Sequence, residues 1–157
     1  MKFTLSVENI LHTARALAAL QVLSAGDAAE DTPASHPLQP LLDSYRDSLH
    51  LTLLVDAEVD IITALRPFVT DAIIPRGSDF DTVEITIAVP RNFSSGEAAI
   101  LLHTLEQAMA NLMLSRFMAA TPDFPDPFAP LADHYITSCC KMISPPPRTA
   151  YIVPGIY

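Results

Sequence analysis

The stretch from Val83 to Ala120 constrains the fold most, because it contains a strand, a stop and a helix start in direct succession. Over residues 83–89, apolar and polar side chains alternate with a period of two, which predicts a strand with one buried face. Ser94 followed by Glu97 is the signature of a capping box, in which the serine hydroxyl accepts a backbone amide and the glutamate reaches back. A strand followed by a long helix is therefore expected in this stretch.

Helical periodicity predicts four helices, over 7–24, 39–72, 95–120 and 130–143. The second of these is open to two interpretations, because its apolar face moves to the opposite side about halfway along. A single long helix that buries different faces at its two ends, bent near its end by Pro67, is the favoured interpretation. Two helices that meet near Asp56 are the alternative.

The length of 157 residues suits a single domain, 1–157, with a core of its own. Polar residues over 26–37 predict a mobile loop between the first two helices. The proline run after Ser144 predicts an extended, proline-rich tail over 144–157. We therefore expect a mainly α fold with a minor β part. It would be an antiparallel bundle of about four helices, with one short strand or a small hairpin before the third long helix.

A single strand leaves its own backbone amides and carbonyls unpaired, so the strand over 83–89 needs a partner. Three candidates exist: the C-terminal residues 149–153, the N-terminal segment Phe3–Leu5, or another chain. An edge strand with alternating Val and Ile is a template for pairing with another chain unless it is covered. We therefore predict contact with a protein partner or a second copy through the strand edge or the tail.

The charge balance bears on the class of partner. The chain carries 9 Lys and Arg against 18 Asp and Glu, a net charge of −9. Binding a phosphate backbone requires clustered cations, so nucleic acid and an anionic membrane are not expected as partners. No apolar run approaches the roughly 20 residues that cross a bilayer. The two cysteines, Cys139 and Cys140, are adjacent, which disfavours a structural disulfide and favours a reducing, cytoplasmic compartment.

Motifs that carry chemistry are missing from the sequence. His103 and Glu106 stand three apart, a spacing that can place two metal ligands on one helix face, but no second such pair occurs. The sequence contains neither a nucleophile elbow nor a glycine-rich phosphate loop. It therefore predicts no catalytic residue, no cofactor and no metal, and it leans against an enzyme.

One cation has a predicted structural role. Arg116 lies within the apolar face of the third long helix, a face that includes Leu105. Unpaired burial of a guanidinium is very costly, so it must reach water at the helix end or find a carboxylate. Asp56, Glu58 and Asp60 form a short acidic run on the preceding helix, and such runs are usually a solvated face. We predict a structural ion pair between Arg116 and Asp56 or Asp60.

The order of the parts carries a resemblance. Two or three helices precede the strand, and a long helix closing on Phe117, a short helix and a proline-rich tail follow it. The strand ends in the motif Val89-Pro90-x-Asn92-Phe93. Over most of residues 40–148, this order resembles a family of small helical proteins from prophage-like loci of gut bacteria. The chain departs from that pattern in having no tryptophan near Phe117 and few basic residues in the tail.

The resemblance implies an association with phage-type structural or assembly genes and supplies no catalytic residues. The leading hypothesis is a non-enzymatic interaction or assembly protein, a structural component of the head–tail or tail type, in the cytoplasm or in a phage-like particle. The alternative is a small-molecule-binding or enzymatic helical domain with a pocket between the long helices. Convergence of His103, Glu106 or Asp60 on such a pocket would favour the alternative.

Overall fold

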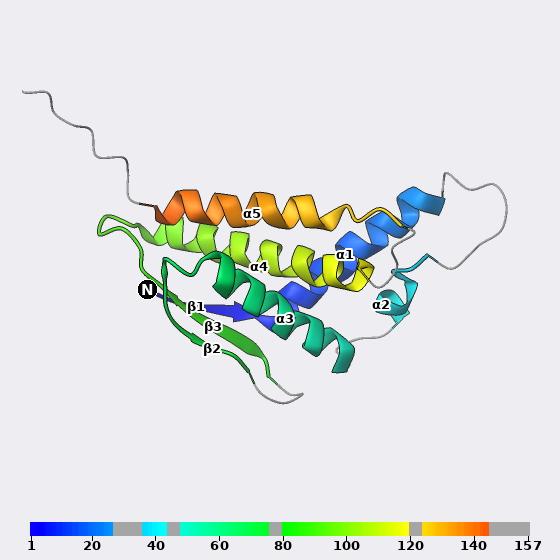
Figure 1. The fold of residues 1–157 in the computed structure, drawn as a ribbon, viewed down its shortest axis with the longest axis horizontal. Helices are drawn as coiled ribbons and strands as arrows, with labels where there is room; N and C mark the ends of the chain where they lie inside the picture. The colour runs from blue at the N-terminus through cyan, green and yellow to red at the C-terminus, as the bar shows by residue number, and fades with distance from the viewer. Residues whose placement is uncertain (27–35, 44–47, 76–79, 120–123, 145–157) are drawn as a thin grey trace, which may run out of the picture.

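The computed structural model describes residues 1–26, 36–43, 48–75, 80–119 and 124–144. In chain order they form β1 (Lys2–Ser6), α1 (Val7–Gly26), α2 (Gln39–Asp43), α3 (Ser48–Ala64), β2 (Val69–Ile73), β3 (Thr82–Ile87), α4 (Ser95–Met118) and α5 (Phe128–Ile143). The fold is mainly helical with a minor β part, as expected from the sequence (Figure 1). The described residues form five helices and a three-stranded antiparallel sheet, where about four helices and one strand or a small hairpin were expected. The loop residues 27–35 and the tail residues 145–157 lie outside the described residues.

The helices lie on one side of the sheet, and α4 is the central helix (Figure 1). It packs against α1, α3, α5 and β1, and it runs antiparallel to α5. The apolar side chains that β1 and β3 turn toward the helices are buried, namely Phe3, Leu5, Val83, Ile85 and Ile87. One cluster of buried apolar side chains extends from the sheet through the five described helices.

The predicted strand is confirmed, and β3 is the central strand of the order β1-β3-β2. On one side it pairs with β1, where Phe3 lies opposite Ile85 and Leu5 opposite Val83. The N-terminal segment is therefore the partner, one of the three candidates considered; residues 149–153 lie outside the described residues. On the other side β3 pairs with β2. The sequence argument assumed that this strand is an edge strand, and that assumption is wrong because β3 lies between β1 and β2.

The prediction of one helix over 39–72 is wrong, and so is the alternative of a junction near Asp56. α2 and α3 are separate helices, α3 continues through Asp56, and it ends at Ala64. Pro67 follows the end of the helix instead of bending it, because proline has no amide to donate and its ring obstructs the preceding turn. The amides of Phe68 and Val69 both donate to the Leu65 carbonyl, which turns the chain into β2.

The predicted start of the long helix is confirmed in atomic detail. The Ser94 hydroxyl accepts the Glu97 amide at 3.2 Å, and the Glu97 carboxylate accepts the Ser94 amide at 2.6 Å. The hydrogen bonds from Ser94 lower the pKa of Glu97. Two backbone amides that have no partner within the helix, those of Ser94 and Glu97, are thereby satisfied, as in a capping box.

Asp126 connects the end of α4 to the start of α5. Its Oδ1 accepts the amides of Phe128 and Ala129 at 2.8 and 3.3 Å, while its Oδ2 accepts the Ser115 hydroxyl at 2.6 Å. A carboxylate at the start of a helix satisfies orphan amides and interacts favourably with the helix dipole. One side chain therefore holds the two helices in antiparallel register.

Candidate functional site

Arg116 on α4 forms an ion pair with Asp60 on α3. The guanidinium Nε donates to Asp60 Oδ2 at 2.9 Å, and Nη2 lies 2.6 Å from Oδ1. This hydrogen bonding, and next the charge of Asp60, raise the pKa of Arg116; Asp56 adds a smaller electrostatic contribution. The two side chains remain 48% and 32% exposed, so the pair connects the helices at the surface. Surface pairs contribute about 0–1 kcal/mol to stability.

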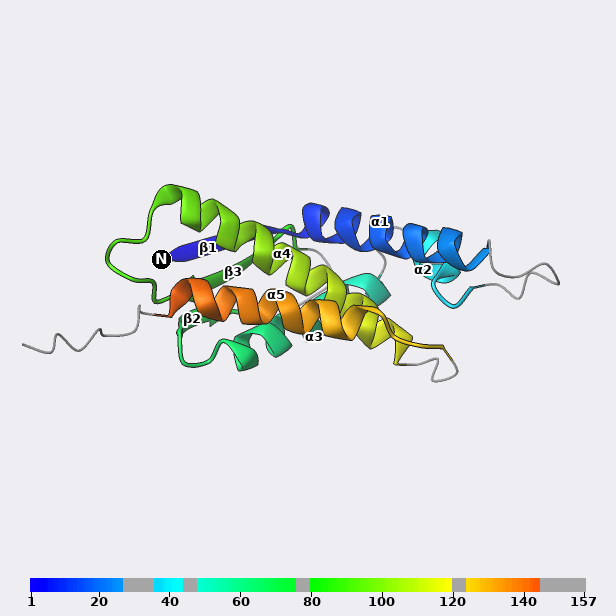
Figure 2. The same cartoon turned by 90° about the horizontal axis from the view of Figure 1, so that it is seen from above.

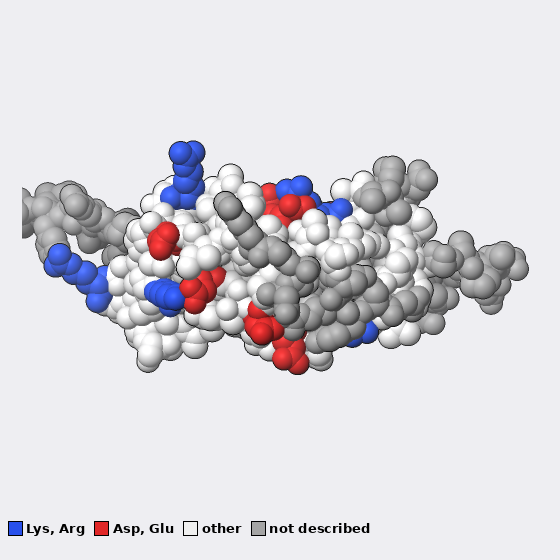
Figure 3. Space-filling view, turned by 90° about the horizontal axis from the view of Figure 1, so that it is seen from below, with Lys and Arg blue, Asp and Glu red and all other residues white. Residues whose placement is uncertain are grey.

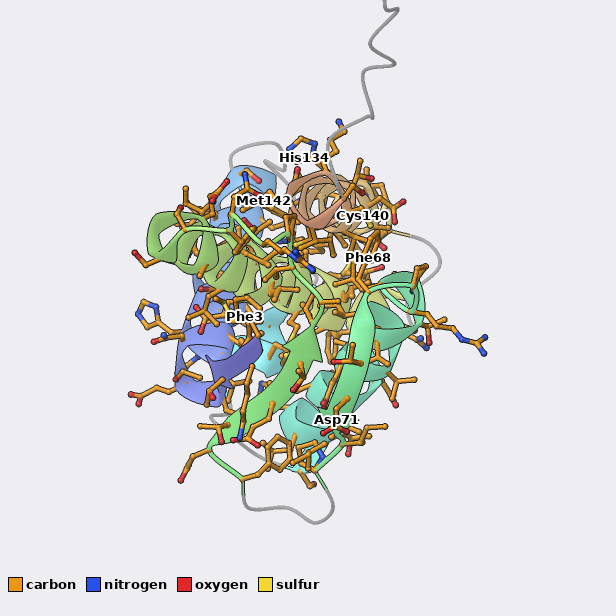
Figure 4. All side chains as sticks on the ribbon, turned by 90° about the vertical axis from the view of Figure 1, so that its left-hand side faces the viewer. Phe3, Phe68, Asp71, His134, Cys140 and Met142 are labelled. Carbon is orange, nitrogen blue, oxygen red and sulfur yellow. The ribbon has the colours of Figure 1, made fainter. Side chains whose placement is uncertain are left out.

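The three residues that would have favoured an active site do not converge. Asp60 is engaged with Arg116, and His103 is exposed on α4. The Glu106 carboxylate accepts the Ser6 amide at 3.2 Å, so it satisfies a backbone group at the end of β1. His134 lies on the outer side of α5 (Figure 4). The described residues contain no group of three His, Cys, Asp or Glu side chains that could hold a metal ion.

The expectation that the acidic run is a solvated face fails for Glu58, which is fully buried. In the part of the chain that the structure describes, neither carboxyl oxygen has a hydrogen-bond partner. Burial raises the pKa of Glu58 from 4.5 to about 7, because the charged form loses its hydration. The sequence contains the signal, since Glu58 lies four residues after Leu54 and three before Ile61, on the same helix face.

The two cysteines differ in burial, since Cys139 is buried and Cys140 is partly exposed. Both are free, and Cys139 is fully buried. Burial, and next the neighbouring Cys140, raise the pKa of Cys139 to about 12. A thiol that stays protonated at neutral pH is a poor nucleophile, so this side chain belongs to the core.

A hollow of about 410 Å³ lies between α1 and α2. It is lined by Glu8, His12, Arg15, Ala16, Ala19 and Leu42. The Arg15 guanidinium spans it by donating to the Leu42 carbonyl at 2.9 Å. All but one of the lining residues come from a single face of α1, so the hollow is a groove along that helix.

The groove continues into an exposed apolar surface. Leu20 and Leu23, on the following turns of α1, are 64% and 69% exposed. Figure 2 shows the C-terminal half of α1 extending past the ends of α4 and α5, with α2 beside it. We name the set Ala16, Ala19, Leu20 and Leu23 the α1 stripe. Sequence reasoning missed it because the first helix was expected to be an ordinary amphipathic helix of the bundle.

Comparison of the chain with protein-family models, with curated proteins and with solved structures finds no match. Among the described residues, no helix is both long and apolar enough to cross a membrane.

Proposed function

We propose that this protein is a non-enzymatic interaction or assembly protein, of the kind that phage-like particles use. In this proposal an antiparallel helix bundle around α4 is the scaffold, and the outer face of α1 is the contact surface. The observation that carries it is the exposure of Leu20 and Leu23 beside an apolar groove. Burying a leucine side chain stabilises an interface by about 1.5–3 kcal/mol, so two adjacent exposed leucines favour a protein partner.

Two of the polar candidates, Asp60 and Glu106, support the same interpretation, because each has a structural partner. Asp60 pairs with Arg116, and Glu106 accepts the amide of Ser6. On the face drawn in Figure 3, the Lys and Arg side chains of the described residues lie apart from one another, some of them against acidic side chains. A nucleic acid partner would favour clustered cations. A second protein is the partner that this surface suits best.

The sheet edges are less suited to the contact than α1. Glu106 occupies the amide of Ser6 on the outer edge of β1. On the opposite edge, β2 has a bulge between Val69 and Asp71, and the Asp71 side chain is exposed (Figure 4). Bulges and charged side chains are features that prevent strand addition. We therefore place the contact on the helix and not on a strand edge.

The test is affinity purification of the tagged full chain from its native cells, with quantitative mass spectrometry and a solution mass for the product. We expect a complex heavier than the 17.0 kDa monomer, with one protein partner or a second copy in stoichiometric amount. Recovery of the bare monomer at native concentration would contradict the proposal.

The groove itself favours a second candidate function, the binding of a small molecule. Its volume of about 410 Å³ lies within the usual range for ligand pockets, and Glu8, His12 and Arg15 supply polar groups. A ligand screen by nuclear magnetic resonance tests this, with Ala16→Trp as the variant that fills the groove. Binding that disappears in this variant supports the second candidate, and a screen without hits against the wild type contradicts it.

A further inference from the structure

We propose that Glu58 is a pH-sensitive switch, whose ionisation opens α3 while α1, α4, α5 and the sheet stay folded. Glu58 is fully buried, and it is the one acidic side chain among the described residues that is. Neither of its oxygens has a hydrogen-bond partner in that part of the chain. A buried polar group that is left unsatisfied calls for an explanation, and here we infer that the explanation is a conformational one.

The surroundings of Glu58 make its two protonation states unequal. Leu54 and Ile61 lie on the same face of α3 and are fully buried, so Glu58 lies among apolar side chains. A carboxylate buried without a counter-ion or hydrogen bonds is so costly that the group takes up a proton instead. The neutral carboxyl loses much less on burial. The closed state of α3 therefore retains the proton, and an open state, in which water reaches Glu58, releases it.

The charged and titratable groups around Glu58 come from α3, from α4, which packs against α3, and from the sheet. Besides Glu58, α3 carries His50, Asp56 and Asp60, and α4 carries Glu97, His103, Glu106 and Arg116. On the sheet, Lys2 pairs with Glu84, and Asp71 is exposed. None of these groups contributes to the shift in the pKa of Glu58, which burial raises.

The position of α3 allows it to open by itself. Figures 2 and 4 show α1 and α3 on opposite sides of α4, so α3 lies at one side of the helical layer. α3 packs chiefly against α4, whereas α4 also packs against α1, α5 and β1 and keeps these contacts when α3 moves. The ion pair of Asp60 with Arg116 is partly exposed, so it holds α3 only weakly. Peripheral elements of this kind open as local units.

The linkage between proton binding and opening sets the size of the effect. The pKa of Glu58 is about 7 in the closed state, and the ordinary value of 4.5 applies once water reaches the carboxyl. The preference for the closed state is fully present below about pH 4.5 and is lost as pH rises through about 7. The ratio of open to closed α3 is therefore expected to rise about 70-fold between pH 5 and pH 8.

The experiment is native-state hydrogen exchange of the full chain by nuclear magnetic resonance, from pH 5 to pH 8 and at several low urea concentrations. Rates are divided by the intrinsic exchange rate at each pH. We expect α3 amides to exchange through an opening that rises with pH and that urea affects little, because it exposes little surface. Amides of α5 are expected to exchange more slowly, through global unfolding, with a strong dependence on urea.

Two variants identify the group responsible. Glu58→Gln removes the titration, so the opening of α3 is expected to be the same at pH 5 and pH 8. Glu58→Leu serves the same purpose should the buried amide prevent folding, because leucine continues the apolar face of α3. Asp56→Asn is the matched control, since Asp56 is an exposed carboxylate on the same helix, and the rise with pH is expected to persist in it.

Each result decides one part of the proposal. Amides of α3 and α5 that share one opening constant and one urea dependence in the wild type would overturn the local opening. An α3 opening that does not change from pH 5 to pH 8 in the wild type would overturn the switch. A rise that survives in Glu58→Gln or Glu58→Leu would overturn Glu58 as the group that controls it.

Discussion

α3 and the C-terminal half of α1 are opposite cases of the same helical pattern. α3 buries a carboxyl group, Glu58, in the middle of its apolar face, whereas α1 exposes Leu20 and Leu23 to water. The difference is in what surrounds each helix, because α3 packs against the central helix and the end of α1 extends past it (Figure 2). Periodicity defines which residues share a face, and the neighbouring elements determine which faces are covered.

The largest expected effect comes from paired leucine truncations that compare the two regions. Leu54→Ala in α3 is expected to lower the free energy of unfolding by about 2–5 kcal/mol, because the fully buried side chain leaves a cavity. Leu20→Ala in α1 is expected to change it by less than about 0.5 kcal/mol in the monomer, since its side chain is largely exposed. Urea unfolding at low micromolar concentration measures both. Equal losses of unfolding free energy in the two variants would mean that Leu20 is buried in the monomer, and would contradict the contrast between α1 and α3.

The next effect is a pH dependence that comes from Glu58. Its pKa is about 7 in the folded protein and 4.5 unfolded, so the folded state binds more protons between these values. The contribution of Glu58 to stability is therefore fully present below about pH 4.5 and falls as pH rises toward about 7, by about 3 kcal/mol in total.

Glu58→Gln is the variant that isolates this pH dependence, because the amide does not titrate. Subtracting the unfolding free energies of the variant from those of the wild type, from pH 4.5 to 8, removes the contribution of other groups. We expect the difference to decline over this range. A flat difference would show that Glu58 ionises normally and that α3 admits water.

The smallest effect concerns the ion pair between α3 and α4. Arg116→Ala is expected to cost about 0–1 kcal/mol, because the pair is partly exposed and competes with water and salt. Arg116→Lys keeps the charge but loses the two-pronged contact, so it separates geometry from charge. Unfolding at low and at high salt checks both variants. A loss of more than about 3 kcal/mol in the alanine variant would indicate a buried pair instead.

Local sequence signals were sufficient to predict part of this fold. The capping box of Ser94 and Glu97 involves residues three apart, and the alternation over 83–89 lies within one strand, so both could be predicted. The partner strand could not be chosen, because Phe3 and Ile85 are distant in sequence and the pairing depends on the whole helical layer. The prediction of one helix over 39–72 is wrong for a different reason. The sequence analysis takes Pro67 as a bend within the helix, whereas the helix α3 ends before it, at Ala64.

The candidate site shows the same division. The sequence by itself determined which side chains share a helix face, such as Glu58 with Leu54 and Ile61, because 3.6 residues per turn is a local property. Only the tertiary structure decided that Asp60 meets Arg116, that Glu58 is enclosed and that Leu20 and Leu23 stay exposed. These outcomes depend on where neighbouring elements end, because a side chain becomes buried only when the helices and the sheet pack against one another.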